Sequence, residues 1–228
     1  MNIPEETNLI ERNNYKLQNR GKQFIKPIKD LALLFIRYKQ LLEMKQRKDL
    51  QWFFKGKQNN PQKILDVCGA YGQWGAYYQK CIHPLQYYAC IDIDKELIKF
   101  GRKYFKFLSL DNSGFTVHDI RCHFPYEKQV FDEIWLFGWY TDNFKREPLF
   151  NEINRVLKKG GMFLFHMPKQ GHRFCKDLDT TEEELLSLIN NTGFSLVMKE
   201  TFVQYPEELT PGYINPFYYY SVKTIKEK

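Results

Sequence analysis

The spacing of hydrophobic residues changes near residue 61. Before that point apolar residues recur every three or four positions, which predicts one amphipathic helix over residues 24–54. We expect this helix to cover an apolar edge of the following domain, or to close over a ligand. A second stripe at Leu34 and Leu41 widens the face that should be buried. The main expected buried stripe comprises Phe24, Ile28, Leu31, Phe35, Tyr38 and Leu42.

After residue 61 short apolar runs alternate with helical patterns, which predicts βαβ units and a mostly parallel sheet. No helical pattern separates the last two strands, so they should run antiparallel to each other. Lys158–Gly161 is expected to end a helix with a glycine cap, and Thr180 with Glu183 suggests a capping box. The expected strands are 63–67, 86–92, 115–118, 131–137, 162–167, 194–202 and 218–224, and the expected helices are 71–81, 94–108, 148–157 and 180–191.

Chain length and composition favour one domain. The 228 residues are 43% hydrophobic, enough for one substantial core. We divide the domain into an N-terminal helical cap over 1–61, a core over 62–167 and a C-terminal part over 168–228. The predicted class is a doubly wound, Rossmann-like α/β fold with seven strands, the last of them antiparallel.

Charge and cysteine usage narrow the function classes. The net charge is +7, and residues 1–60 hold thirteen Lys or Arg against six Asp or Glu, so the excess lies in this segment. It indicates either an anionic partner, such as nucleic acid, or a solvated helix face. Five cysteines without a CxxC pair read as free thiols, not as a disulfide frame or a zinc site. With neither a signal pattern nor a long apolar run, we expect a cytoplasmic protein with no membrane partner and no metal.

The first predicted strand ends in a loop of small residues that suits a ligand held close to backbone. Asp66 is followed by Cys68, Gly69, Ala70 and Gly72, and then by a predicted helix whose N-terminus offers free N–H groups. A P-loop is excluded because no lysine and hydroxyl follow Gly72, and the glycine spacing is wrong for a dinucleotide fingerprint. The Asp66 carboxylate would repel a pyrophosphate but would suit a ligand with an ammonium group.

Two further acids end the next strands, where parallel neighbours would bring them beside the loop. Asp92 can accept hydrogen bonds from both hydroxyls of a ribose. Asp119 can accept one from an adenine amino group, with Ile93 and Ile120 as apolar walls of the ring slot. Asp66 and Asp92 could instead cap helix N-termini.

In this order the segments resemble the class I S-adenosylmethionine-dependent methyltransferases, most closely their small-molecule branch. The resemblance spans residues 62 to about 166 and implies S-adenosylmethionine as the cofactor, with Phe137 at the end of the fourth strand as a further cofactor contact. The family's glycine triplet falls on Cys68, Ala70 and Gly72, so one glycine of three is retained. The matching runs are Ile64–Gly72, Cys90–Asp94, His118–Ile120, Phe131–Ile134 and Leu157–Leu164.

The acceptor is predicted to be a small molecule, methylated at oxygen or nitrogen by in-line displacement. His166, His172 and Tyr140 are candidates for a general base, although His166 could equally be a core histidine. Two alternatives remain open, namely an RNA methyltransferase that uses the basic N-terminal segment and a non-catalytic module that retains the fold. The candidate acceptor-binding residues are Trp139, Tyr140, Tyr205 and Tyr213.

Overall fold

The structure is a computed structural model that describes residues 30–44, 48–54, 62–137, 146–169, 180–204 and 217–227. Within these ranges no helix is both long enough and apolar enough to cross a membrane. The helices are α2 (Asp30–Glu43), α3 (Lys48–Phe54), α4 (Gln73–Cys81), α5 (Lys95–Phe107), α6 (Arg146–Val156) and α7 (Glu182–Asn191). The strands are β1 (Lys63–Val67), β2 (Tyr87–Asp92), β3 (Ser113–Val117), β4 (Phe131–Leu136), β5 (Leu157–Pro168), β6 (Phe194–Gln204) and β7 (Phe217–Lys226).

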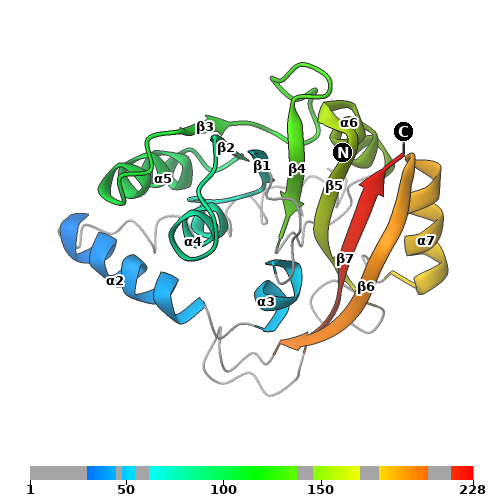
Figure 1. The fold of residues 1–228 in the computed structure, drawn as a ribbon, viewed down its shortest axis with the longest axis horizontal. Helices are drawn as coiled ribbons and strands as arrows, with labels where there is room; N and C mark the ends of the chain where they lie inside the picture. Colours follow the sequence, from blue (N-terminus) through cyan, green and yellow to red (C-terminus); the bar gives the residue numbers. More distant parts are fainter. Residues whose placement is uncertain are drawn as a thin grey trace, which may run out of the picture.

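One seven-stranded sheet runs through the molecule in the order β3-β2-β1-β4-β5-β7-β6 (Figure 1). Strands β3, β2, β1, β4 and β5 are parallel, whereas β7 is antiparallel to both β5 and β6. The predicted doubly wound sheet with a reversed last strand is therefore confirmed. The strand order reverses direction at β1, which lies between β2 and β4, and ligands of open α/β sheets bind at the carboxyl ends of strands at such a point.

The alternation of side chains along β1 separates two hydrophobic cores. Leu65 and Val67 pack on the face covered by α6 and α7, and Ile64 packs on the face covered by α2 to α5. The Asp66 side chain points to the same face of the sheet as that of Ile64. Cys90 of β2 and Trp135 of β4 lie beside Asp66 on the neighbouring strands. A carboxylate is thereby placed in the interior, beneath the loop that follows β1.

The N-terminal cap differs from its prediction in the stripe that it buries. Of the expected helix over 24–54 the structure describes α2 and α3, and residues 24–29 and 45–47 lie outside the described ranges. Leu34 and Leu41 form the buried stripe, at 9% and 2% exposure. Phe35, from the stripe expected to be buried, is 56% exposed.

Two contacts of Arg37 explain which stripe of α2 faces the core. The backbone carbonyl of Arg37 accepts a hydrogen bond from the Tyr104 hydroxyl of α5 at 3.2 Å. The Arg37 guanidinium also lies 5.4 Å from the ring centroid of Tyr71, in the loop after β1. These contacts turn Leu34 and Leu41 inward, so that α2 touches the predicted cofactor loop through Tyr71.

Two predicted helix boundaries are also corrected. Helix α6 ends at Val156, and β5 begins at the next residue, so Lys158–Gly161 forms an irregular start to a strand and not a glycine cap. There Lys158 forms an ion pair with Asp132 of β4 at 2.6 Å, which favours the extended path. The capping box of α7 lies one residue later than predicted, between Thr181 and Glu184. Thr180 is 1% exposed, and its hydroxyl accepts a hydrogen bond from Arg146.

Candidate cofactor site

The loop between β1 and α4 adopts a left-handed backbone at three alternate residues. The φ angles are 55° at Cys68, 52° at Ala70 and 78° at Gly72. These are the three positions on which the glycine triplet of the resemblance falls. A non-glycine residue costs about 1–2 kcal/mol in this conformation, so the backbone is strained at Cys68 and at Ala70.

Glycine is needed at position 69 for a reason unrelated to its φ angle. A Cβ atom there would lie 2.7 Å from both the Asp66 Cγ and the Cys90 Sγ. At Gly72 a Cβ atom would lie 2.8 Å from Cε2 of Phe105, in addition to the left-handed φ. The absence of side chains at Gly69 and Gly72 thus lets the loop lie directly on the protein interior, beside Asp66.

The Asp66 carboxylate is fully buried, and among the described residues only one of its two oxygens has a hydrogen-bond partner. Its Oδ2 accepts a hydrogen bond from the Tyr88 hydroxyl at 2.6 Å, while its Oδ1 is buried without a hydrogen-bond partner among the described residues. Burial raises the pKa of Asp66 from 3.8 to about 7, although the Tyr88 hydrogen bond acts in the opposite direction. A buried carboxylate oxygen without a partner fits a cationic group, as the predicted contact with an ammonium requires.

Asp92 ties the loop to the end of β2. Its Oδ2 accepts the N–H of Ala70 at 2.9 Å, and its Oδ1 accepts the N–H of Asp94 at 2.9 Å. Burial raises the pKa of Asp92, and the two backbone hydrogen bonds act against that rise. Each carboxylate oxygen can accept a second hydrogen bond, so both oxygens keep capacity for the ribose hydroxyls of the prediction.

Asp119 has a different environment, which the sequence did not indicate. Arg121 donates from Nε to both carboxylate oxygens at 2.9 Å and from Nη2 to Oδ2. These hydrogen bonds hold the pKa of Asp119 below its ordinary value. The Arg121 side chain is 62% exposed and that of Asp119 is 27% exposed. An adenine amino group would therefore meet a carboxylate that is already paired.

The Cys68 side chain shows that the three acids converge. Burial raises the pKa of the Cys68 thiol, and the negative charges of Asp92, Asp66 and Asp119 raise it further. The thiol thus lies within the electrostatic reach of all three carboxylates. A cation among them would relieve the repulsion, which again fits a positively charged ligand.

The predicted apolar contacts differ in their exposure. Ile93 is 53% exposed, whereas Phe137 is 3% exposed and Ile120 packs partly against the core beneath α6. Beside Ile120 an open hollow of about 440 Å³ lies between the segment after β3 and the first turns of α6. This hollow adjoins the Asp119 end of the site, and its lining includes Arg121 and Glu152.

His166 is the one candidate base that lies within the described ranges. It is 2% exposed, and its ring centroid lies 5.2 Å from those of Phe53 and Phe137 and 4.8 Å from that of Tyr219. This enclosure, which includes the α3 residue Phe53, was not evident from the sequence and favours the core interpretation of His166. Outside the described residues lie the candidates Trp139, Tyr140, His172, Tyr205 and Tyr213.

Three comparisons with known proteins agree with this geometry. Residues 64–161 match the family described as a methyltransferase domain. A demethylmenaquinone methyltransferase of Staphylococcus aureus is 27% identical over 174 residues, covering 61% of this chain and 70% of the relative. A structure of an S-adenosylmethionine-dependent methyltransferase from Methanosarcina mazei has a TM-score of 0.61 at 16% identity, covering 75% of this chain and 94% of that one.

The matched segment and the sheet point to one class of protein. Residues 64–161 match a methyltransferase domain, and together with the relatives this match supports a class I S-adenosylmethionine-dependent methyltransferase that uses S-adenosylmethionine as its cofactor. The fold alone does not fix the reaction, because the cyclase SpnF has a TM-score of 0.62 at 16% identity, covering 75% of this chain and 76% of the cyclase.

Proposed function

We propose that this enzyme methylates a small-molecule acceptor, at oxygen or nitrogen, at the carboxyl edge of the sheet. The observation that carries the proposal is the position of Asp66, Asp92 and Asp119 at the carboxyl ends of the neighbouring strands β1, β2 and β3, with Asp92 bound to the left-handed loop through the N–H of Ala70. The sulfonium of the cofactor supplies an electrophilic methyl group. Because such a displacement is in line, holding the two reactants in the correct orientation can supply much of the rate.

Each acid is assigned one part of the cofactor in this proposal. Asp66 faces the ammonium, and its buried Oδ1 supports that assignment. Asp92 faces the ribose hydroxyls while it keeps its hydrogen bond from Ala70. Asp119 faces the adenine amino group, with Ile93 and Ile120 on either side of the ring. Phe137, which directly follows β4, would be a further cofactor contact.

The acceptor is assigned to the region beyond β4 and β5. The predicted acceptor residues Trp139 and Tyr140 follow β4, while Tyr205 and Tyr213 lie between β6 and β7. Strand β6 is parallel to β5, because both are antiparallel to β7, so the connection from β6 leaves at the carboxyl edge. The name of the demethylmenaquinone relative supports an organic small molecule as the acceptor.

Calorimetry with S-adenosylmethionine tests the cofactor assignment. We expect saturable binding by the full chain, and no heat at millimolar cofactor would instead support a non-catalytic module. Transfer of labelled methyl groups from the cofactor to a panel of phenols, amines and quinols tests the acceptor class. Mass spectrometry and NMR of the product then locate the methyl group, and a methylated carbon would overturn the assignment to oxygen or nitrogen.

RNA is the competing acceptor, because the basic residues of the N-terminal segment favour an anionic partner. Methyl transfer to total RNA, lost on charge reversal at Arg37, Lys45, Arg47 and Lys48, would replace the small-molecule proposal. Retained transfer to small molecules by the same variant would support it. Because Arg37 also contacts Tyr71 of the cofactor loop, the affinity of the variant for S-adenosylmethionine is measured beside both assays, which separates a lost RNA contact from lost cofactor binding.

A further inference from the structure

The outer face of α2 is unusually apolar. Six residues between Leu33 and Leu42 are exposed, and four of these are large and hydrophobic. Single exposed apolar residues are ordinary on protein surfaces, but a cluster on one short helix marks a surface that binds something. The exposed fractions are 56% for Phe35, 47% for Ile36, 39% for Tyr38 and 44% for Leu42.

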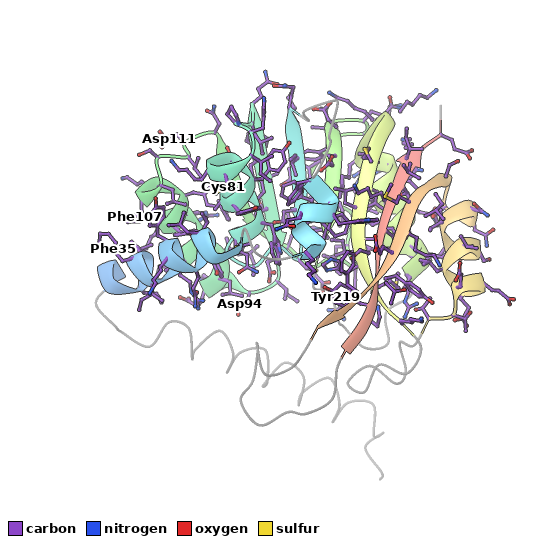
Figure 2. The ribbon with its side chains drawn as sticks, turned by 60° about the horizontal axis from the view of Figure 1, so that its bottom comes forward. Phe35, Cys81, Asp94, Phe107, Asp111 and Tyr219 are labelled. Carbon is purple, nitrogen blue, oxygen red and sulfur yellow. The ribbon has the colours of Figure 1, made fainter. Side chains whose placement is uncertain are left out.

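This apolar face adjoins the strongly basic helix α5. The rings of Phe35 and Phe107 are in edge contact, with centroids 5.4 Å apart (Figure 2). Helix α5 carries five basic residues and one acid, Glu96, and its basic residues are exposed. They lie on the solvent side of α5, since Ile98, Gly101, Tyr104 and Phe105 face the core. The basic residues are Lys95, Lys99, Arg102, Lys103 and Lys106.

We propose that the face formed by α2 and α5, here called the α2–α5 face, binds peripherally to an anionic lipid surface. Apolar side chains on a helix that is bordered by Lys and Arg match the two layers of such a surface, its acyl boundary and its negative headgroups. This proposal is independent of the methyl acceptor. It departs from the expectation of no membrane partner, which rested on the absence of a spanning segment.

Charge and side-chain shape favour a lipid surface over two other ligands for this face, a second copy of the chain and single-stranded RNA. A second copy of the chain on the same face would bring two α5 helices of equal positive charge toward each other. Single-stranded RNA would meet the charge of α5, but it binds mainly by stacking bases on planar groups. Phe35 and Tyr38 provide aromatic planes on this face, but Ile36 and Leu42 are aliphatic and provide none, whereas an acyl boundary accepts all four side chains.

Co-sedimentation with vesicles tests the proposal on the full chain. We compare phosphatidylcholine vesicles with vesicles that also contain roughly 30% phosphatidylglycerol, expecting binding to the anionic vesicles that weakens with added salt. The variant F35S/L42S removes apolar surface, and K99E/K106E reverses charge on α5. Each should weaken binding to anionic vesicles by about tenfold or more.

Two matched variants serve as controls. V197S/M198S removes exposed apolar side chains from β6, at 51% and 49% exposure, on the far edge of the sheet. K128E/K159E reverses two exposed charges that lie outside α2 and α5. Both controls should bind anionic vesicles as the parent does. Circular dichroism and affinity for S-adenosylmethionine verify that each variant is folded.

Several outcomes would overturn the lipid assignment. The first is a parent chain that binds neither vesicle at millimolar lipid, and the second is an equal loss of binding in the controls and the α2–α5 variants. A third is binding to a uridine oligonucleotide, without vesicle binding, that K99E/K106E abolishes, because RNA would then be the partner. A fourth is a dimer in sedimentation velocity that F35S/L42S dissociates, because the face would then join two copies of the chain.

Discussion

The two ends of the candidate cofactor site are built differently. At the end formed by β1 and β2, Asp66 is buried and Asp92 holds the loop through the N–H of Ala70. At the β3 end, Asp119 is paired with the exposed Arg121. Changes at the buried end should therefore alter folding and binding together, whereas changes at the Asp119 end should alter binding with little effect on folding.

The largest expected effect is a pH dependence that originates at Asp66. Its folded-state pKa of about 7 lies above the ordinary 3.8, so the folded chain holds this proton more tightly than the unfolded chain does. The stability from this group is fully present below about pH 4 and is lost as pH rises through about 7. Relative to Asp66→Asn, the parent should lose roughly 3 kcal/mol of unfolding free energy between about pH 5 and about pH 8.

Urea unfolding of the parent and of Asp66→Asn at both pH values measures this difference. A parallel response of the two proteins would show that Asp66 is not the titrating group. Calorimetry with S-adenosylmethionine extends the test, because an ammonium contact favours the ionised carboxylate. Binding near pH 6 should then release a proton from the parent and not from the Asn variant, as measured in buffers of different ionisation enthalpy.

A methyl group added at Gly69 should damage the buried end directly. Gly69→Ala introduces a Cβ atom 2.7 Å from the Asp66 Cγ and the Cys90 Sγ, and overpacking of this kind costs about 1–3 kcal/mol. Gly160→Ala is the matched control, since nothing lies within 4 Å of its added Cβ and only the φ of 71° opposes it. In denaturant unfolding Gly160→Ala should lose about 1–2 kcal/mol to this backbone strain, and it should bind the cofactor as the parent does, whereas Gly69→Ala should lose stability and also bind the cofactor more weakly. A Gly69→Ala variant with the stability and cofactor affinity of the parent would refute the close packing of the loop on Asp66.

Asp92→Ala should weaken cofactor binding by about 1.5–3 kcal/mol, the scale of hydrogen bonds to a charged group. The loop would also lose its anchor at the Ala70 N–H, which is 2.9 Å from Asp92 Oδ2. Isothermal titration with S-adenosylmethionine and with adenosine separates the ribose contact from the ammonium contact. Both ligands should lose affinity, and unchanged affinity for adenosine would contradict the ribose assignment.

Glycine at position 70 should stabilise the chain. Ala70 has a φ of 52°, and Ala70→Gly relieves about 1 kcal/mol of backbone strain. Part of this gain is offset because glycine also increases the freedom of the unfolded chain. A small rise in the denaturation midpoint with unchanged m-value is expected, and a fall would show that the Ala70 side chain contributes packing of its own.

The smallest stability effect is expected at Asp119. Asp119→Asn removes a largely exposed ion pair with Arg121, and such pairs contribute about 0–1 kcal/mol to folding. Affinity for S-adenosylmethionine should fall while the unfolding midpoint hardly moves. Arg121→Gln is the matched variant, because it removes the guanidinium from the Asp119 carboxylate, while the backbone N–H of residue 121 still donates to Oδ1 at 2.9 Å. If Asp119 contacts the adenine, the two substitutions should act on affinity in opposite directions.

The sequence was sufficient for features set by periodicity and spacing. Alternating strands and helices, the reversed β7 and the convergence of Asp66, Asp92 and Asp119 all follow from which residues end each parallel strand. The roles of Asp92 and Asp119 as ligand contacts stay predictions, and their partners inside the protein, the Ala70 N–H and Arg121, were not predicted. Arg121 lies only two residues from Asp119. Their pairing could not be predicted because it depends on the backbone conformation of the segment after β3, which the sequence does not show.

Features that depend on how two elements meet could not be predicted in this way. Both stripes of α2 are apolar, and the choice between them depends on Tyr104 and Tyr71, which come from other elements. The start of β5 depends on the pairing of Lys158 with Asp132, which outweighs the local preference of two glycines for a helix cap. Local propensity is a weak guide wherever a distant charge or ring supplies the stronger contact.

The loop at Cys68 and Ala70 has a consequence for how this family is found in genomes. A motif written as glycine, spacer, glycine, spacer, glycine records a set of dihedral angles, and a search scores only the letters. A cysteine and an alanine at φ angles of 55° and 52° keep those angles at a cost of about 1–2 kcal/mol each. Chains with small residues in place of the glycines can therefore lack the three letters of the motif and still match the domain as a whole, as residues 64–161 of this chain do.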